Sequence, residues 1–154
     1  VKIGEDSCFN LNTFLSSNSI ISINKFLYNY RKNNNSLTQG KYNKDLGNSI
    51  ISQYIEKLSI YNKYNLHEDT YKRLYLSFIT HSMNTMINNI YNSNSENKIK
   101  EIKELRNGEL IKNAINNISI IKIIQSNYPI GIKLRTILIK YKKYKILNSI
   151  YGRV

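Results

Sequence analysis

The residue types best suited to chemistry lie near the beginning of the chain. Glu5 and Asp6 form an acidic pair directly before an apolar pattern that starts at Phe9. We predict that the pair occupies the first turn of a short helix, where the positive end of the helix dipole favours carboxylates. A carboxylate in this position either caps the helix or is available to accept a proton from a hydroxyl group. Taken alone, the pair is explained by capping.

Other reactive residue types have no partners at a useful spacing. Cys8 lies on the same predicted helix and is interpreted as a small packing residue; as the one cysteine of the chain it excludes an internal disulfide. His67 and His81 follow no catalytic or ligand pattern, so we interpret both as structural. One cysteine and two separated histidines do not make a zinc site of familiar spacing.

A small β element is expected to follow the acidic pair. The β-branched and aromatic runs at 20–23 and 26–30 predict two short strands, and the polar stretch 31–40 predicts a loop. Helical periodicity covers most of what remains. The predicted fold class is therefore mainly α, a helical bundle with a short N-terminal β-hairpin-like element.

The predicted helices are defined by apolar steps of three and four residues. The first begins near Asn43 and has an expected inward face of Ile51, Tyr54, Ile55, Leu58 and Tyr61. The second covers about 68–91, with inward residues Tyr71, Leu74, Tyr75, Phe78, Met83, Met86, Ile87 and Ile90. The third covers 96–107 and stops at Gly108, and a shorter one runs to about Asn117.

Pro129 interrupts the helical pattern, and a basic amphipathic tail helix is predicted over 128–154. Its apolar face is expected to carry Leu134, Ile137, Leu138, Tyr141, Tyr144, Leu147 and Tyr151.

The net charge of +13 is unevenly distributed along the chain. All 10 acidic residues lie at or before Glu109. The charged residues that follow are all basic: Lys112, Lys122, Lys133, Arg135, Lys140, Lys142, Lys143, Lys145 and Arg153. This third of the chain is predicted to attract anions, either lipid headgroups or nucleic acid.

Four short motifs in the first 38 residues carry a family resemblance. In order they are Gly4-Glu5-Asp6-Ser7-Cys8-Phe9, the Ile-rich run, Leu27-Tyr28-Asn29-Tyr30-Arg31 and Asn35-Ser36-Leu37-Thr38. Each motif alone is weak, but the four together, in this order and spacing, resemble family 2 glycosyltransferases of the GT-A type from bacteria. The resemblance covers about a quarter of the chain, and the helical remainder agrees only in style.

The resemblance implies how the chain is organised. Residues 1–40 would form the C-terminal edge of a GT-A α/β catalytic domain, 41–127 a helical extension and 128–154 the basic tail helix. The chain begins in what resembles the end of a strand, so we expect it to be a piece of a longer protein. The nucleotide-binding half with its Asp-x-Asp motif would lie upstream, and no Asp-x-Asp occurs in these residues.

The resemblance also implies an inverting sugar transfer from a nucleotide-sugar donor to a hydroxyl acceptor, in the synthesis of cell-surface polysaccharide or glycolipid. An acceptor hydroxyl needs a carboxylate to take its proton as the bond forms. The family's proposed base maps onto Asp6, and Glu5 would hold the loop or a neighbouring acceptor hydroxyl. The Mn or Mg ion of such enzymes would be bound in the missing half, so this chain alone is expected to bind no cofactor and to be inactive.

Three further residues are candidates for substrate binding. Arg31 would bind the donor diphosphate in bidentate fashion, with a solvated cation at a strand end as the alternative. Ser36 and Thr38 belong to a loop that would close over substrate, with a plain surface loop as the alternative.

The tail is a candidate for contact with an anionic membrane surface. Its expected contact residues are Lys133, Arg135, Lys140, Lys142, Lys143 and Lys145. The alternative is an ordinary amphipathic helix whose basic side is solvated. With the resemblance, this predicts a cytoplasmic protein, peripheral on the inner face of the plasma membrane.

Two rival interpretations do not assume that the chain is part of an enzyme. One is a stand-alone basic helical module that binds an anionic membrane or nucleic acid. The nucleic-acid version is disfavoured because no helix-turn-helix, zinc or RNA-recognition motif is present. The other is a helical bundle used for homo-oligomerisation.

Overall fold

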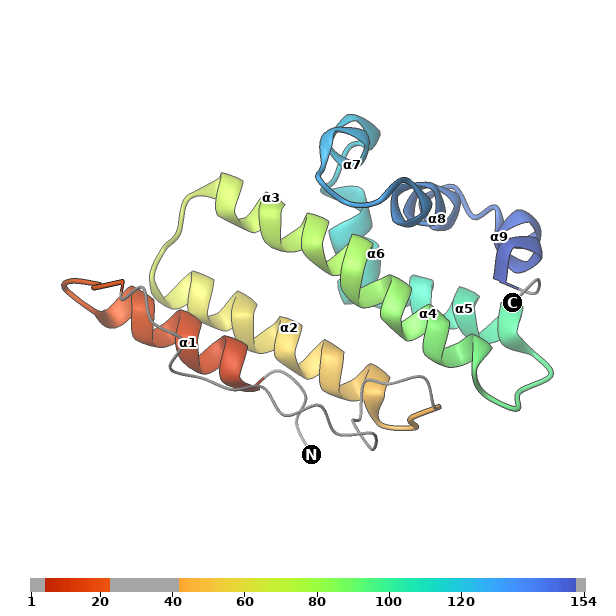
Figure 1. Ribbon diagram of the computed structural model, residues 1–154, viewed down its shortest axis with the longest axis horizontal. Helices are drawn as coiled ribbons and strands as arrows, with labels where there is room; N and C mark the ends of the chain where they lie inside the picture. The colour runs from red at the N-terminus through yellow and green to blue at the C-terminus, as the bar shows by residue number, and fades with distance from the viewer. Residues whose placement is uncertain (1–4, 23–41, 152–154) are drawn as a thin grey trace. The chain divides into compact units, whose positions relative to one another are not determined.

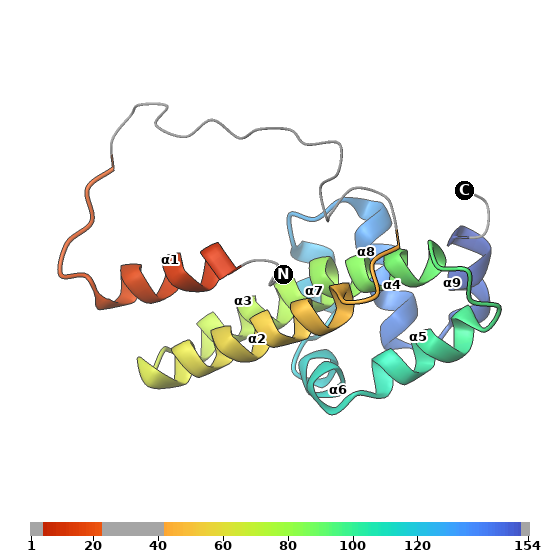
Figure 2. The ribbon, with the colours of Figure 1, turned by 90° about the horizontal axis from the view of Figure 1, so that it is seen from below.

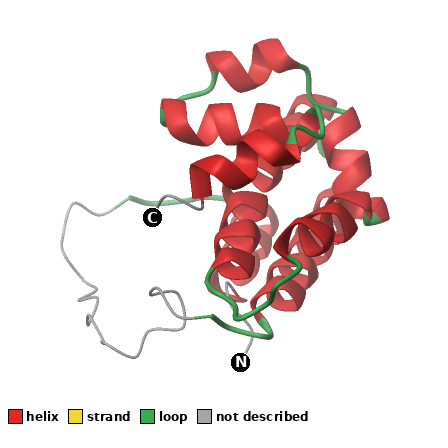
Figure 3. Cartoon of the chain, turned by 90° about the vertical axis from the view of Figure 1, so that its right-hand side faces the viewer, coloured by secondary structure: helices red, strands yellow, loops and turns green. Residues whose placement is uncertain are grey.

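The computed structural model describes residues 5–22 and 42–151, and the described residues are helical with no strand among them (Figure 3). The side chain of Glu5 is not described. The chain divides into two compact units, Val1–Asn65 and Leu66–Val154, which we describe separately (Figure 1). The prediction of a mainly α fold is confirmed. The first predicted strand is wrong in its described part, because residues 20–22 have no regular structure, and the second, 26–30, lies outside the described residues.

The first unit is built on two helices, α1 (Glu5–Ser16) and α2 (Leu46–Lys63). They run in the same direction, as Figures 1 and 2 show. Cys8 packs near Gln53, with 3.7 Å from its Sγ to the Gln53 carbonyl oxygen, and Tyr64 donates to Asn12 Oδ1 at 3.3 Å. Cys8 is buried, as predicted, while Phe9 and Phe14 are exposed.

The second unit contains one long helix with an irregular turn in its middle. It comprises α3 (Glu68–Ser77), the π-helix η1 (Phe78–Ser82) and α4 (Met83–Tyr91). His67 caps the start, because its Nδ1 accepts from the backbone N–H of Asp69 at 3.3 Å. The helix predicted over 68–91 is confirmed, and so is the structural role of His67.

Five shorter helices complete the described part of the second unit. They are α5 (Lys98–Asn107), α6 (Glu109–Asn116), α7 (Ile120–Gln125), α8 (Ile130–Lys140) and α9 (Tyr144–Tyr151). The π-helix contacts both α6 and α8, and the buried residues gather around it. The largest fully buried apolar side chains of this unit are Ile79, Met83, Ile87, Ile102, Ile115, Ile118, Ile123, Ile139 and Leu147.

A buried polar network links the long helix to α8 and α9. Asn84, 4% exposed, donates from Nδ2 to the Thr80 carbonyl at 2.8 Å and to Thr136 Oγ1 at 3.1 Å. Tyr151 donates from its hydroxyl to Asn84 Oδ1 at 3.4 Å. The network satisfies polar groups that would otherwise destabilise the core.

The tail forms two helices where one was predicted. After α8 the Lys143 N–H donates to the Leu138 carbonyl at 2.8 Å, and the Lys142 N–H donates to that of Ile139 at 3.1 Å. With Lys142 at φ 58°, this is a Schellman motif, which ends a helix and turns the chain. Of the predicted apolar face, Leu147 and Leu138 are buried, whereas Leu134 and Tyr141 are exposed.

Candidate functional site

A hollow of about 460 Å³ lies between α1 and α2 in the first unit. It is lined by Cys8, Phe9, Asn12, Glu56, Ser59, Ile60 and Lys63. Asn12 lies at its polar side, where its Oδ1 accepts from Lys63 Nζ at 3.5 Å and from the Tyr64 hydroxyl. The lining of the hollow therefore contains an exposed aromatic ring, an amide, a hydroxyl, a carboxylate and an ammonium group.

Asp6 lies one helical turn before Phe9, in the first turn of α1. Its side chain is exposed and does not line the hollow. The predicted short helix with an acidic first turn is confirmed. The dipole of the helix favours a negative charge in its first turn. Asp6 is thus accessible to a second molecule, and its role as a base stays a prediction.

The other predicted residues of this site are not placed by the structure. Arg31, Ser36 and Thr38 lie outside the described residues, as does the side chain of Glu5. Within the described part of the chain, Asp6 lies close to Phe9. The position of Asp6 relative to Arg31 is not described.

Sequence reasoning missed the polar residues of the hollow. Glu56, Ser59 and Lys63 follow one another at helical steps of three and four along α2. That spacing signals a shared face, but it does not reveal which other helix the face meets. The pairing with Asn12 joins residues about 50 positions apart, with 51 separating Asn12 from Lys63, and so depends on tertiary structure.

The sequence is similar to that of a glycosyltransferase. It is 29% identical over 117 residues to the uncharacterized glycosyltransferase EpsJ of Bacillus subtilis (strain 168), and the match covers 75% of this chain. The match covers 34% of EpsJ, so the chain spans about a third of the length of that relative. No protein-family profile and no solved structure matches the chain.

The match with EpsJ extends well into the helical part of the chain. Because it covers 75% of the residues, it includes α2 to α5 wherever it begins. The similarity is therefore not confined to the short motifs of the first 38 residues, and the helices after them belong to what the two proteins share.

A second acidic pair gives a direct comparison for Glu5 and Asp6. Glu68 and Asp69 open α3 just as the first pair opens α1. Lys72 lies 2.6 Å from Glu68 and 3.7 Å from Asp69. The hydrogen bond from Lys72, together with its charge, lowers the pKa of the Glu68 carboxyl. No Lys or Arg occurs in α1, so Asp6 lacks such a partner on its own helix.

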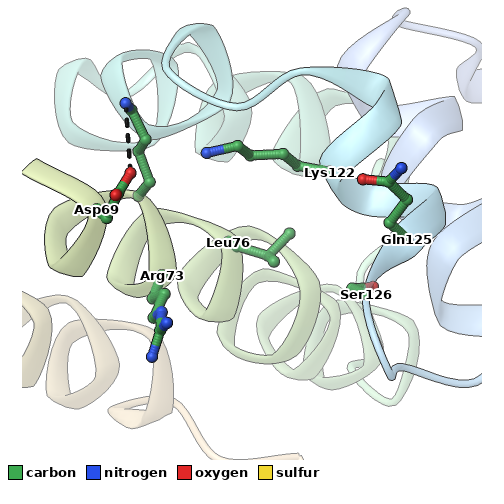
Figure 4. Close-up of a pocket in the computed structure, with 7 residues that line it drawn as sticks. Asp69, Arg73, Leu76, Lys122, Gln125 and Ser126 are labelled. Atoms are coloured by element: carbon green, nitrogen blue, oxygen red, sulfur yellow. Dashed lines mark ion pairs between the residues drawn. The ribbon is translucent and has the colours of Figure 1, made fainter.

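Another hollow, of about 530 Å³, lies in the second unit between α3 and α7 (Figure 4). Lys122 extends from α7 towards α3, whereas Arg73 extends to the other side of α3. Lys72, also at the hollow, is already paired with the acidic residues of α3. The basic groups here do not converge on one point, so we assign no anion site to this hollow.

The described residues contain no cluster of three or more His, Cys, Asp or Glu that could hold a metal ion. No residue of the described part is therefore assigned to the metal that the family resemblance implies.

The predicted cationic residues of the tail divide into two groups. The ammonium of Lys140 donates to the carbonyls of Ile115 at 2.6 Å and Ile118 at 2.8 Å, at the end of α6. Burial, with a smaller effect from the charge of Arg106, lowers the pKa of Lys140. The guanidinium of Arg135 lies 5.2 Å from the centre of the Tyr151 ring. Lys133 is half-buried, and its Nζ donates to the Ile124 carbonyl at 2.7 Å. The exposed cations of the predicted group are Lys142, Lys143 and Lys145.

Among the described residues, no helix is both long enough and apolar enough to cross a membrane.

Proposed function

We propose that this chain is the C-terminal part of an inverting glycosyltransferase. The intact protein would transfer a sugar from a nucleotide-sugar donor to a hydroxyl acceptor, in the synthesis of cell-surface polysaccharide or glycolipid. The observation that carries this proposal is the similarity to EpsJ, which spans most of this chain and a third of that protein.

Asp6 is proposed to act as the general base. Its exposed position in the first turn of α1 supports this role, because an acceptor hydroxyl needs direct access to the carboxylate. Glu5 would hold a neighbouring acceptor hydroxyl, and Arg31 would bind the donor diphosphate in bidentate fashion. Ser36 and Thr38 would belong to the loop over the substrate.

The remaining parts of the active site are proposed to lie in the rest of the intact protein. A nucleotide-binding part would hold the donor and a Mn or Mg ion, whose charge would balance that of the departing diphosphate. The protein is proposed to work in the cytoplasm at the inner face of the plasma membrane. On this account the 154-residue chain alone transfers no sugar.

The experiment that tests the proposal compares the intact protein with this chain alone. Each is incubated with a set of labelled nucleotide sugars and a crude glycolipid acceptor, and the product is analysed by NMR. We expect product from the intact protein only, with an anomeric configuration opposite to that of the donor. Retained configuration would contradict the inverting mechanism, and no product with any donor would contradict the transferase proposal.

A further inference from the structure

Four large aliphatic side chains are exposed where α7 meets α8. Ile121 and Ile124 are 64% and 55% exposed on α7, and Ile130 and Leu134 are 83% and 49% exposed on α8. Their spacings of three and four residues place each pair on one face of its helix. We call these four residues the α7–α8 corner.

The two helices of the corner are held together. They contact each other, and Lys133 Nζ of α8 donates to the Ile124 carbonyl of α7 at 2.7 Å. Ser126 closes the end of α7 by donating to the Ile123 carbonyl at 2.6 Å, and Pro129 precedes the first residue of α8. The exposed side chains therefore belong to a fixed element rather than to a loose end.

The charges around the corner are positive. Lys122 lies between Ile121 and Ile124 in sequence and is exposed, and Lys133 precedes Leu134. No acidic residue follows Glu109 in the sequence. Asp69 of α3 is the acidic residue that lines the same hollow as Lys122, and it is already paired with Lys72. An apolar surface bordered by a cation, in a chain with a net charge of +13, is complementary to the boundary between anionic headgroups and acyl chains.

We propose that the α7–α8 corner inserts into an anionic lipid surface, with its aliphatic side chains among the acyl chains and Lys122 at the headgroups. A nucleic acid fits less well, because the exposed side chains are aliphatic and offer no ring for base stacking. A second copy of the chain also fits less well, because each copy carries +13.

The proposal places the membrane contact at the corner rather than at the lysines predicted for it. Lys133 and Lys140 donate to backbone carbonyls, whereas Lys142, Lys143 and Lys145 lie at the break after α8 and in α9. The corner does not depend on sugar transfer, so the two proposals fail separately.

The absence of tryptophan from the chain allows a clean test of insertion. Ile124→Trp and Ile130→Trp would each place one reporter at the corner, and Ile55→Trp on α2 and Ile146→Trp on α9 are controls at similarly exposed isoleucines. With phosphatidylglycerol–phosphatidylcholine vesicles, we expect a blue shift and quenching by brominated lipid at the corner positions only. Equal responses at all four positions, or a response at Ile146→Trp alone, would overturn the proposal.

Vesicle sedimentation of the 154-residue chain measures the contribution of the side chains. We expect Ile124→Ser and Ile130→Ser each to lower the partition coefficient about tenfold, through lost apolar burial. Lys122→Gln should lower it about fivefold, and Ile55→Ser should leave it unchanged. Circular dichroism checks that each variant is folded.

The same variants distinguish the other partners. Binding to purely neutral vesicles at equal strength, or no binding of the unaltered chain to anionic vesicles, would overturn the proposal. So would binding to single-stranded DNA that the Ile→Ser substitutions weaken equally.

Discussion

At the scale of single residues, Asp6 and Asp69 show that an acidic pair at the start of a helix does not by itself indicate a function. Both follow a glutamate in the first turn of a helix, and both are exposed. Asp69 is explained by its own helix, because His67 caps the backbone and Lys72 pairs with the acids. α1 contains no basic residue, so local structure accounts for Asp69 more completely than for Asp6.

The same scale shows what the sequence could predict of the candidate site. The acidic first turn of α1 follows from the order of charged and apolar residues, and the burial of Cys8 follows from its type. The contact of Asn12 with Lys63 and Tyr64 could not be predicted, because it depends on how α1 and α2 lie side by side. Arg31, Ser36 and Thr38 lie outside the described residues.

Tyr151 provides a prediction for the pH dependence of stability. Burial raises the pKa of its hydroxyl above 10.0, against a smaller opposite effect of Arg135, and the hydroxyl donates to Asn84. Above about pH 10 the unfolded chain loses this proton before the folded chain does, so the stabilisation falls as pH rises.

We therefore expect Tyr151→Phe to lower the free energy of unfolding by about 1 kcal/mol near neutral pH and by less at alkaline pH. Urea unfolding followed by circular dichroism at about pH 7 and about pH 11 measures the difference between the two proteins. A difference that stays constant over this range would contradict the assignment.

At the scale of elements, the long helix contains an irregular turn, the π-helix η1, which accommodates one extra residue. The predicted inward residues leave a step of five from Phe78 to Met83, but the buried Ile79 lies between them, four residues before Met83. The apolar spacing alone therefore does not reveal the extra residue. The buried Ile79, Thr80 and Asn84 were missed because a regular α-helix was assumed.

Because η1 accommodates one extra residue, two single-residue deletions should have different outcomes. Deleting the exposed His81 should convert η1 into α-helix and keep both inward faces aligned, so the chain stays folded at a cost of about 1–3 kcal/mol, on the scale of a typical destabilising change. Deleting Arg73, also exposed, shifts the face of α3 with no extra residue to absorb the shift, and should unfold the second unit. Thermal unfolding measures the loss of stability in each variant. Equal losses would contradict the assignment of one extra residue to η1.

The break between α8 and α9 was not predicted because its sequence signal is absent. Helices commonly end at a glycine in the left-handed conformation, and here Lys142 takes that position at φ 58°. The helix α2 ends similarly at Asn65, φ 47°, a residue type that tolerates the conformation better.

Lys142→Gly should therefore stabilise the second unit by about 0.5–1 kcal/mol, because glycine adopts a positive φ without steric strain. Lys143→Gly is the matched control, since Lys143 is equally exposed and has no positive φ. Chemical denaturation measures both variants, and a stabilisation by Lys143→Gly of the same size would contradict this explanation.

At the scale of the whole molecule, composition and periodicity predicted the helical fold but not the division of the chain. The boundary between the two units follows Asn65. The sequence indicates this boundary only by the end of an apolar stripe. The first unit is small, and its helices leave Phe9 and Phe14 exposed. Two of the four motifs that carry the resemblance to a catalytic domain, at 27–31 and 35–38, lie outside the described residues.

The chain's similarity to a third of EpsJ makes the intact protein the right object for the decisive experiment. The central claim is that Asp6 accepts a proton from the acceptor hydroxyl. Its most direct test is the turnover of the intact protein carrying Asp6→Asn beside the same protein carrying Asp69→Asn, the equivalent change at the start of α3. The account predicts that Asp6→Asn lowers kcat by about 10²–10⁴-fold while donor binding is kept, and that Asp69→Asn leaves kcat unchanged. Equal turnover in the two variants would contradict it.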